Sequence, residues 1–201
     1  MTPVIDNWIK RLLDALSPKD ALIPRATALR PYFSEEDMTA AQVLESLTAR
    51  WLSEVCGGSL SFRSIGRGEV ETEERAIGHA PLDLGVYPSR YKPCVERWTE
   101  EHQIDERRNS PEGVPASEFR DSPFIAQIEV TSYGSLPWDE SRFLPVVSHK
   151  VDYALELPIP SYMVAWSLRD DPWRIFFIPM RKIAEYPADE IFNRRLGIYQ
   201  H

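Results

Sequence analysis

The chain has 201 residues, of which 43% are hydrophobic and 27% are charged, and its formal net charge at pH 7 is −8. This length is typical of one folded domain, and the balance of hydrophobic and charged residues excludes a disordered chain, a collagen-like chain and a coiled coil. The negative net charge excludes a nucleic-acid-binding surface over the whole molecule, so nucleic acid can bind only through local basic patches.

Several other classes of protein lack support in the sequence. It contains neither of the glycine-rich phosphate-binding motifs, GxGxxG and GxxxxGK[ST], and its two cysteines, Cys56 and Cys94, form no CxxC pair. The first ten residues hold no apolar run of the kind found in signal peptides. The longest apolar runs, such as residues 175–180, are too short to span a bilayer. We therefore expect a soluble cytoplasmic protein that does not enter a membrane.

The N-terminal part is predicted to be a helical extension over residues 1–38. Apolar side chains recur at helical spacing over residues 3–16, which predicts an amphipathic helix. Three prolines within residues 18–33 indicate a connector. The remainder, residues 39–201, is expected to form a single α/β domain.

The clearest helix is predicted over residues 39–56. Thr39 and Gln42 match the capping-box pattern at a helix start, and apolar residues then recur along one side of the helix. The pair Gly57-Gly58 predicts its end, because glycine readily adopts the backbone conformation that follows a helix.

The first strands are predicted on both sides of a polar segment. Alternating apolar and polar residues indicate strands at 59–65 and 81–87, with a loop or hairpin at 66–80 between them. The stretch 88–122 is rich in proline and charge and is long for a connector, so we interpret it as an insertion or lid with a short helix over 94–103.

The second half of the chain contains the strongest strand prediction, at 124–133, where β-branched and aromatic residues are concentrated. A helix is predicted over 146–157. Two mostly apolar segments, 161–168 and 173–180, have the composition of buried central strands. A short final helix is predicted over 188–195. Helices on both sides of a run of strands predict an α/β fold with a mixed central sheet flanked by helices.

Two acids in the predicted strands indicate a metal site. Asp83 faces away from the apolar residues of strand 81–87, and Glu129 shares the polar face of strand 124–133 with Thr131. A carboxylate in apolar surroundings costs free energy unless it has a partner, and a hard cation such as Mg²⁺ would be one. The alternative is that both acids face solvent or pair with an arginine or lysine.

The order of these elements resembles that of the PD-(D/E)XK nuclease superfamily. In that family a helix bearing an acid precedes a strand hairpin with an aspartate, a strand with a (D/E)xK motif, and then a further helix and strand. The resemblance covers about residues 39–180 and implies a restriction-endonuclease-like fold with an inserted segment. The matching residues would be Glu45 or Glu54 on the first helix, Asp83 in APLDLGV and Glu129-Val130-Thr131 in IEVTSY.

The lysine of the family motif is missing from its usual place. Two residues after Glu129 stands Thr131, whose hydroxyl can donate a hydrogen bond but carries no charge. Lys150, on the next predicted helix, is a candidate substitute, because lysines of this superfamily sometimes lie on that helix. The alternative is that Lys150 is an ordinary exposed lysine.

The resemblance implies a Mg²⁺-dependent nuclease that hydrolyses phosphodiester bonds. Asp83, Glu129 and the carbonyl group of Val130 would hold the Mg²⁺, and Lys150 or Thr131 would position the attacking water. Phosphate contacts need basic side chains near the site. The candidates are Arg63, Arg67, Arg90, Lys92, Arg181, Lys182, Arg194 and Arg195.

A second hypothesis belongs to a different class of function. The missing lysine and the net charge of −8 also fit a non-catalytic acidic binding or regulatory module, including one with a lapsed nuclease fold. Such a module would dock on a protein partner, because an acidic surface steers association toward basic partners.

Overall fold

The computed structural model describes residues 35–66, 81–108, 110, 112–133, 148–167, 174–185, 191–193 and 198–200. The predicted helix 3–16, the connector 18–33 and nearly all of the predicted loop 66–80 lie outside these residues. Among the described helices, none is long and apolar enough to cross a membrane.

Helix α2 (Glu35–Val55) is longer at its start than predicted. The prediction of a capping box at Thr39 is wrong, because the helix begins four residues earlier. The predicted end is confirmed: Gly57 and Gly58 follow the helix with positive φ angles of 61° and 73°, which glycine adopts without strain.

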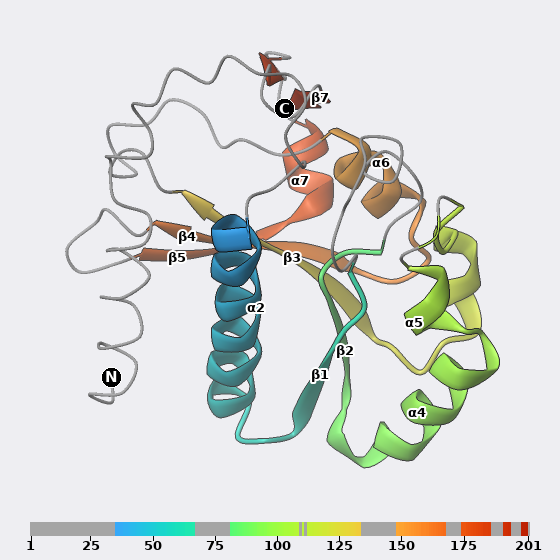
Figure 1. Ribbon diagram of the computed structural model, residues 1–201. Coiled ribbons are helices and arrows are strands. Elements are labelled where there is room, and N and C mark those ends of the chain that lie inside the picture. The colour runs from blue at the N-terminus through green and yellow to red at the C-terminus, as the bar shows by residue number, and fades with distance from the viewer. Residues whose placement is uncertain are drawn as a thin grey trace.

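Five strands form one mixed sheet in the order β1-β2-β3-β4-β5 (Figure 1). The pairs β1-β2, β2-β3 and β4-β5 are antiparallel, whereas β3 and β4 are parallel. A parallel pair needs a crossover connection, and helix α6 (Ser148–Glu156) lies in that connection. The strands are β1 (Leu60–Ser64), β2 (Leu84–Pro88), β3 (Ala126–Tyr133), β4 (Ser161–Ser167) and β5 (Arg174–Pro179). The predicted α/β fold with a mixed sheet is confirmed.

The sheet buries apolar side chains on both faces. On β4, Met163 and Ala165 belong to one core whereas Val164 and Trp166 belong to the other, as the two-residue period of a strand requires. Helix α2 covers the second core, and its Thr48 hydroxyl accepts a hydrogen bond from Trp166 Nε1 at 2.9 Å. Two cores separated by one sheet are the layered arrangement expected of an α/β domain.

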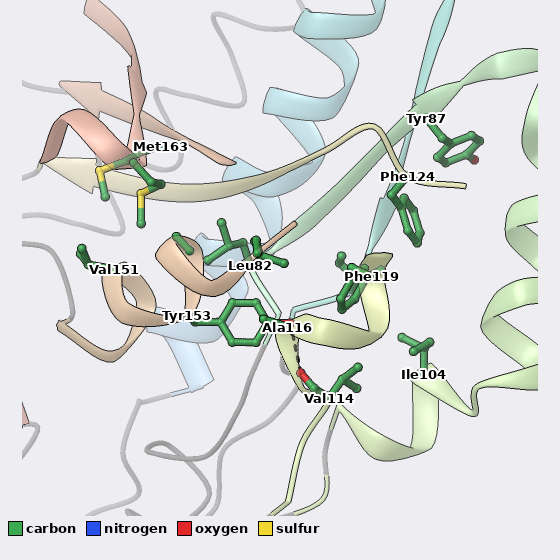
Figure 2. Close-up of a cluster of buried hydrophobic side chains, with 14 of the residues drawn as sticks. Leu82, Tyr87, Ile104, Val114, Ala116, Phe119, Phe124, Val151, Tyr153 and Met163 are labelled. Carbon is green, nitrogen blue, oxygen red and sulfur yellow. Dashed lines mark hydrogen bonds between the residues drawn. The ribbon is translucent and has the colours of Figure 1, made fainter. Parts of the chain in front are cut away.

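The stretch 88–122, predicted to be an insertion or lid, contains several short helices. These are η1 (Ser89–Tyr91), α4 (Lys92–Glu101), α5 (Ile104–Arg107) and η2 (Ala116–Asp121). The short helix predicted over 94–103 corresponds to α4. Figure 2 shows side chains of this stretch packed together with Tyr153 of α6, whose hydroxyl donates a hydrogen bond to the Val114 carbonyl at 3.0 Å. The stretch therefore belongs to the packed core opposite α2, and its action as a lid stays a prediction.

Two predictions for the C-terminal part are wrong. Segment 173–180 was expected to be a buried central strand, but β5 is at the edge of the described sheet and Phe177 is 47% exposed. Helix α7 (Met180–Glu185) follows it directly. In place of the helix predicted over 188–195, β6 (Ile191–Asn193) and β7 (Ile198–Gln200) form an antiparallel pair, in which β-branched and aromatic residues favour extended backbone.

Candidate functional site

Asp83 lies immediately before β2 and not inside a strand, which corrects the predicted strand 81–87. The predicted alternation of Leu82 and Leu84 on one face fails because the two side chains are buried in different cores. The Asp83 carbonyl accepts backbone hydrogen bonds from Ile65 at 2.9 Å and from Gly66 at 3.1 Å. Asp83 is therefore held beside the end of β1 by its backbone.

Gly66 permits this close approach of the two chain segments. A Cβ atom added at Gly66 would lie 2.7 Å from Asp83 Cα and 2.9 Å from Asp83 Oδ1, which is closer than real Cβ atoms come to such neighbours. Any side chain at position 66 would therefore displace Asp83. The sequence contains no local signal for this role, because the contact joins residues far apart in the chain.

Strand β3 holds the Asp83 segment from the other side. The Leu82 N–H donates to Gln127 Oε1 at 3.1 Å, and the Val130 N–H donates to Asp83 Oδ2 at 2.8 Å. The side chain of Asp83 is therefore fixed next to Glu129, the residue that precedes Val130. The predicted faces of β3 are confirmed, because Ile128 and Val130 pack in the core under α2 whereas Glu129 points to the opposite side.

Lys150, on α6, contacts both strand-associated acids. Its Nζ atom lies 3.2 Å from Glu129 Oε2 and 4.0 Å from Asp83 Oδ1, and it donates a hydrogen bond to the Pro81 carbonyl at 3.1 Å. The exposed fractions of the Lys150, Glu129 and Asp83 side chains are only 13%, 14% and 17%. Lys150 is therefore not an exposed surface lysine, and the acids are paired with a lysine as well as close to each other.

The two glutamates proposed on the first helix have different surroundings. Glu45 is half-buried, and its pKa is raised to about 8 by burial and by the nearby charges of Asp83 and Glu129. Glu54 is 59% exposed and forms an ion pair with Arg50 at 3.0 Å. Nine residues correspond to about 2.5 turns of a helix, so the two glutamates project from opposite sides of α2. Glu45 therefore joins the site and Glu54 does not.

Excess negative charge dominates the electrostatics of this acid and lysine site, which we define as Glu45, Asp83, Glu129 and Lys150. Burial and then the charge of Asp83 raise the pKa of Glu129 to about 7, and burial also raises the pKa of Asp83. Burial alone would lower the pKa of Lys150, but Glu129 and Asp83 outweigh it, so the pKa lies above its ordinary value. Three acids thus share one ammonium group.

The carboxylate oxygens of the site lie next to a cation. Glu129 Oε2 is buried, and the Lys150 ammonium is 3.2 Å from it. Within the described part of the chain, no group of three or more His, Cys, Asp and Glu side chains is arranged to hold a metal ion. Mg²⁺ usually takes only one or two protein carboxylates, with water and substrate oxygens as its other ligands. Asp83 and Glu129 together fit that smaller requirement.

The structure gives less support to the roles predicted for Val130 and Thr131. The Val130 N–H is used by Asp83, and the binding role of the Val130 carbonyl stays a prediction. Thr131 is half-buried, and among the described residues no hydrogen bond joins it to Asp83, Glu129 or Lys150. The positive charge beside Asp83 and Glu129 therefore comes from Lys150 on α6 and not from β3.

The predicted phosphate-binding residues are scattered. Most of the described ones already have a partner. Arg63 pairs with Asp105, Lys92 with Glu96 and Lys182 with Glu185, and the Arg90 guanidinium lies over the Tyr91 ring. Arg181 is exposed, whereas Arg67, Arg194 and Arg195 lie outside the described residues. Arg108, which the sequence did not single out, lies near enough for its charge to oppose the raised pKa of Glu45.

Comparison with known proteins found no matching family model, no matching curated protein and no matching solved structure. The function is therefore argued from the chemistry of the acid and lysine site.

Proposed function

We propose that this protein is a Mg²⁺-dependent nuclease of the PD-(D/E)XK type, which hydrolyses phosphodiester bonds. The observation that carries the proposal is the meeting of Asp83, Glu129 and Lys150 at one buried position, with Glu45 beside them. These residues come from four different parts of the chain, so the cluster is a product of the fold and not of local sequence.

The order of the elements supports the proposal. Glu45 lies on the helix that precedes the sheet, Asp83 in the β1–β2 hairpin, Glu129 on β3 and Lys150 on the following helix. This is the order in which the resembled superfamily places its acid-bearing helix, its aspartate and its (D/E)xK strand. The departure at Thr131 is compensated because Lys150 supplies an ammonium group 3.2 Å from Glu129.

The chemistry of each side chain suits hydrolysis of a phosphodiester. Asp83, Glu129 and the Val130 carbonyl would hold Mg²⁺, which when bound lowers the pKa of a water and stabilises charge on phosphate oxygens. Lys150 is held by the Pro81 carbonyl and can donate a hydrogen bond to the attacking water or to a phosphate oxygen. Glu45 has a pKa of about 8, so it can hold or release a proton close to neutral pH.

The direct test is cleavage of plasmid DNA, single-stranded DNA and RNA in the presence of Mg²⁺ or Mn²⁺. The wild type is expected to cleave at least one of these substrates, and Glu129→Ala is expected to lose at least about 100-fold in rate because a carboxylate ligand is removed. Glu54→Ala is the matched control, since Glu54 is exposed on the same helix as Glu45.

Equal activity of the wild type and Glu129→Ala would remove the hypothesis, because the activity would then come from elsewhere. A folded wild type that cleaves none of the substrates, and whose Tm does not rise with Mg²⁺, would also contradict it. The acidic docking module would then be the hypothesis to pursue.

A further inference from the structure

We infer that Arg63 and Arg108 form a binding position for a backbone phosphate of a nucleic acid, directly beside the acid and lysine site. This inference rests on the proposed function, because it places the substrate of that reaction. Its evidence is separate, since it comes from the guanidinium groups and not from the carboxylates.

The two arginines converge from different elements on one carboxylate. Arg63 lies on β1, and its Nη2 atom is 2.7 Å from Asp105 Oδ2. Arg108 directly follows α5, and its Nε atom is 3.9 Å from Asp105 Oδ1. One aspartate between two guanidinium groups leaves the trio with an excess of positive charge. This local excess contrasts with the net charge of the chain, which is −8.

This basic position borders the acid and lysine site. Arg108 Nη1 donates a hydrogen bond to the Ser64 carbonyl at 3.1 Å, and Ser64 pairs with Leu84, the residue after Asp83. The charge of Arg108 also acts on Glu45. A phosphate at Arg63 and Arg108 would therefore lie next to the carboxylates, on the β1 side of the sheet.

Both arginines retain hydrogen-bonding capacity. The Nε atoms of Arg63 and Arg108 are buried and have no hydrogen-bond partner in the described part of the chain. The side chains are nevertheless partly accessible, with exposed fractions of 29% and 22%. A guanidinium group presents five N–H donors in a planar fork that matches the oxygens of phosphate. Because the Nε atoms are buried, a phosphate would contact the terminal nitrogens of the two guanidinium groups.

Arg107, the residue before Arg108, differs from Arg63 and Arg108 because its charge is fully paired. Its two terminal nitrogens each donate to a different oxygen of Glu118, both at 2.7 Å. The pair is balanced in charge and its geometry is bidentate. Within the described residues, Arg63 and Arg108 share the single carboxylate of Asp105.

A phosphate-binding position is also a physical requirement of the proposed reaction. The ionised fraction of Asp83, Glu129 and Glu45 repels an approaching polyanion, and this repulsion grows as pH rises through their raised pKa values. Basic contacts to flanking phosphates overcome that repulsion, and their contribution weakens as salt concentration rises because counterions are released on binding. Arg63 and Arg108 would supply such contacts beside the end of β1 and the Asp83 segment.

The test is binding of fluorescently labelled single-stranded DNA, duplex DNA and RNA in EDTA, measured by anisotropy over a range of salt concentrations. We expect Arg63→Gln and Arg108→Gln each to weaken binding about tenfold and to reduce the slope of log affinity against log salt by about one. Arg108→Lys is expected to retain the slope, because it keeps the charge. Arg97→Gln, which removes an exposed charge from α4, controls for the change in net charge.

Unchanged binding in both glutamine variants would overturn the inference, as would a wild type that binds none of the three probes. A loss equal to that of Arg97→Gln would do the same. If one variant does not fold, as judged by its Tm, the other decides. A wild type that binds through these arginines but never cleaves with Mg²⁺ contradicts only the nuclease proposal, whereas cleavage by fully binding arginine variants contradicts only this inference.

Discussion

Arg107 and Glu118 form a balanced ion pair, in which two hydrogen bonds of 2.7 Å join one cation to one anion. Hydrogen bonding to Arg107 lowers the pKa of Glu118, and hydrogen bonding to Glu118 raises the pKa of Arg107. Each group thus favours the charged form of the other. An arrangement of this kind stabilises the local structure and has no need of a further ligand.

The acid and lysine site has the opposite character. Its three carboxyl groups all have raised pKa values. Burial is the largest cause for each of them, and the charges of neighbouring acids add to it for Glu45 and Glu129. One buried oxygen of Glu129 has the Lys150 ammonium as its ion-pair partner at 3.2 Å. The difference shows that proximity of opposite charges does not by itself indicate a structural role, because the two regions differ in how well cations balance their acids.

The largest expected effect is the loss of cleavage when Lys150 is replaced. Replacing Arg107, the basic member of the balanced ion pair, provides the comparison. Lys150→Met is expected to reduce cleavage by about 100-fold or more, because a positioned donor that stabilises developing charge is lost. Arg107→Met is expected to leave cleavage unchanged and to lower stability by roughly 1 kcal/mol, the size of a partly exposed ion pair. Initial rates with Mg²⁺ and thermal unfolding of both variants check this contrast.

The opposite pattern would break the comparison. If Arg107→Met lost activity as strongly as Lys150→Met, the two regions would not be functionally distinct.

A smaller loss, of at most about 100-fold, is expected from Gly66→Ala. The added methyl group must displace Asp83, and a shift of about 1 Å in a reacting group can cost about 100-fold in rate. Gly58→Ala is the matched control, because a Cβ atom there meets nothing within 4 Å although the φ angle of 73° makes the substitution strained. The control should lower the Tm without lowering the rate per folded molecule. Full activity of folded Gly66→Ala would show that the position of Asp83 is unimportant.

The smallest expected effect is a pH dependence of stability in EDTA. The folded-state pKa values of Glu129, about 7, and Glu45, about 8, lie above the ordinary value of 4.5, so the folded state binds protons more tightly than the unfolded state. Their contribution is therefore most favourable below the ordinary value and is lost as pH rises through 7 to 8. Glu118, with a lowered pKa, contributes stability that is present at neutral pH and lost as pH falls.

Urea unfolding between about pH 5.5 and 8.5 checks this sign, because carboxyl groups with ordinary pKa values do not titrate over that range. Glu129→Gln and Glu45→Gln should each flatten the decline in the free energy of unfolding toward high pH, whereas Glu118→Gln should leave it unchanged. A wild type that becomes more stable across this range, with the same slope in Glu129→Gln, would contradict the raised pKa values.

The elements of the fold were predicted best where the pattern is local and long. The faces of β3 follow from strict alternation, and the end of α2 follows from two glycines that need no tertiary partner. The predictions failed for short segments such as 188–195, where a few residues fit a helix or a strand equally well and pairing with a neighbour decides.

The candidate site shows the same limit of prediction from local sequence patterns. Sequence alone identified Asp83, Glu129 and Lys150 as candidates, and it left open whether Glu45 or Glu54 would join them. It determined the chemical types available and the order in which the chain supplies them. Only the tertiary structure decided which glutamate faces the strands, that Lys150 and not Thr131 meets the acids, and that Gly66 must lack a side chain. The physical reason is that periodicity describes one element at a time, whereas these contacts depend on the packing of a helix and a hairpin against β3.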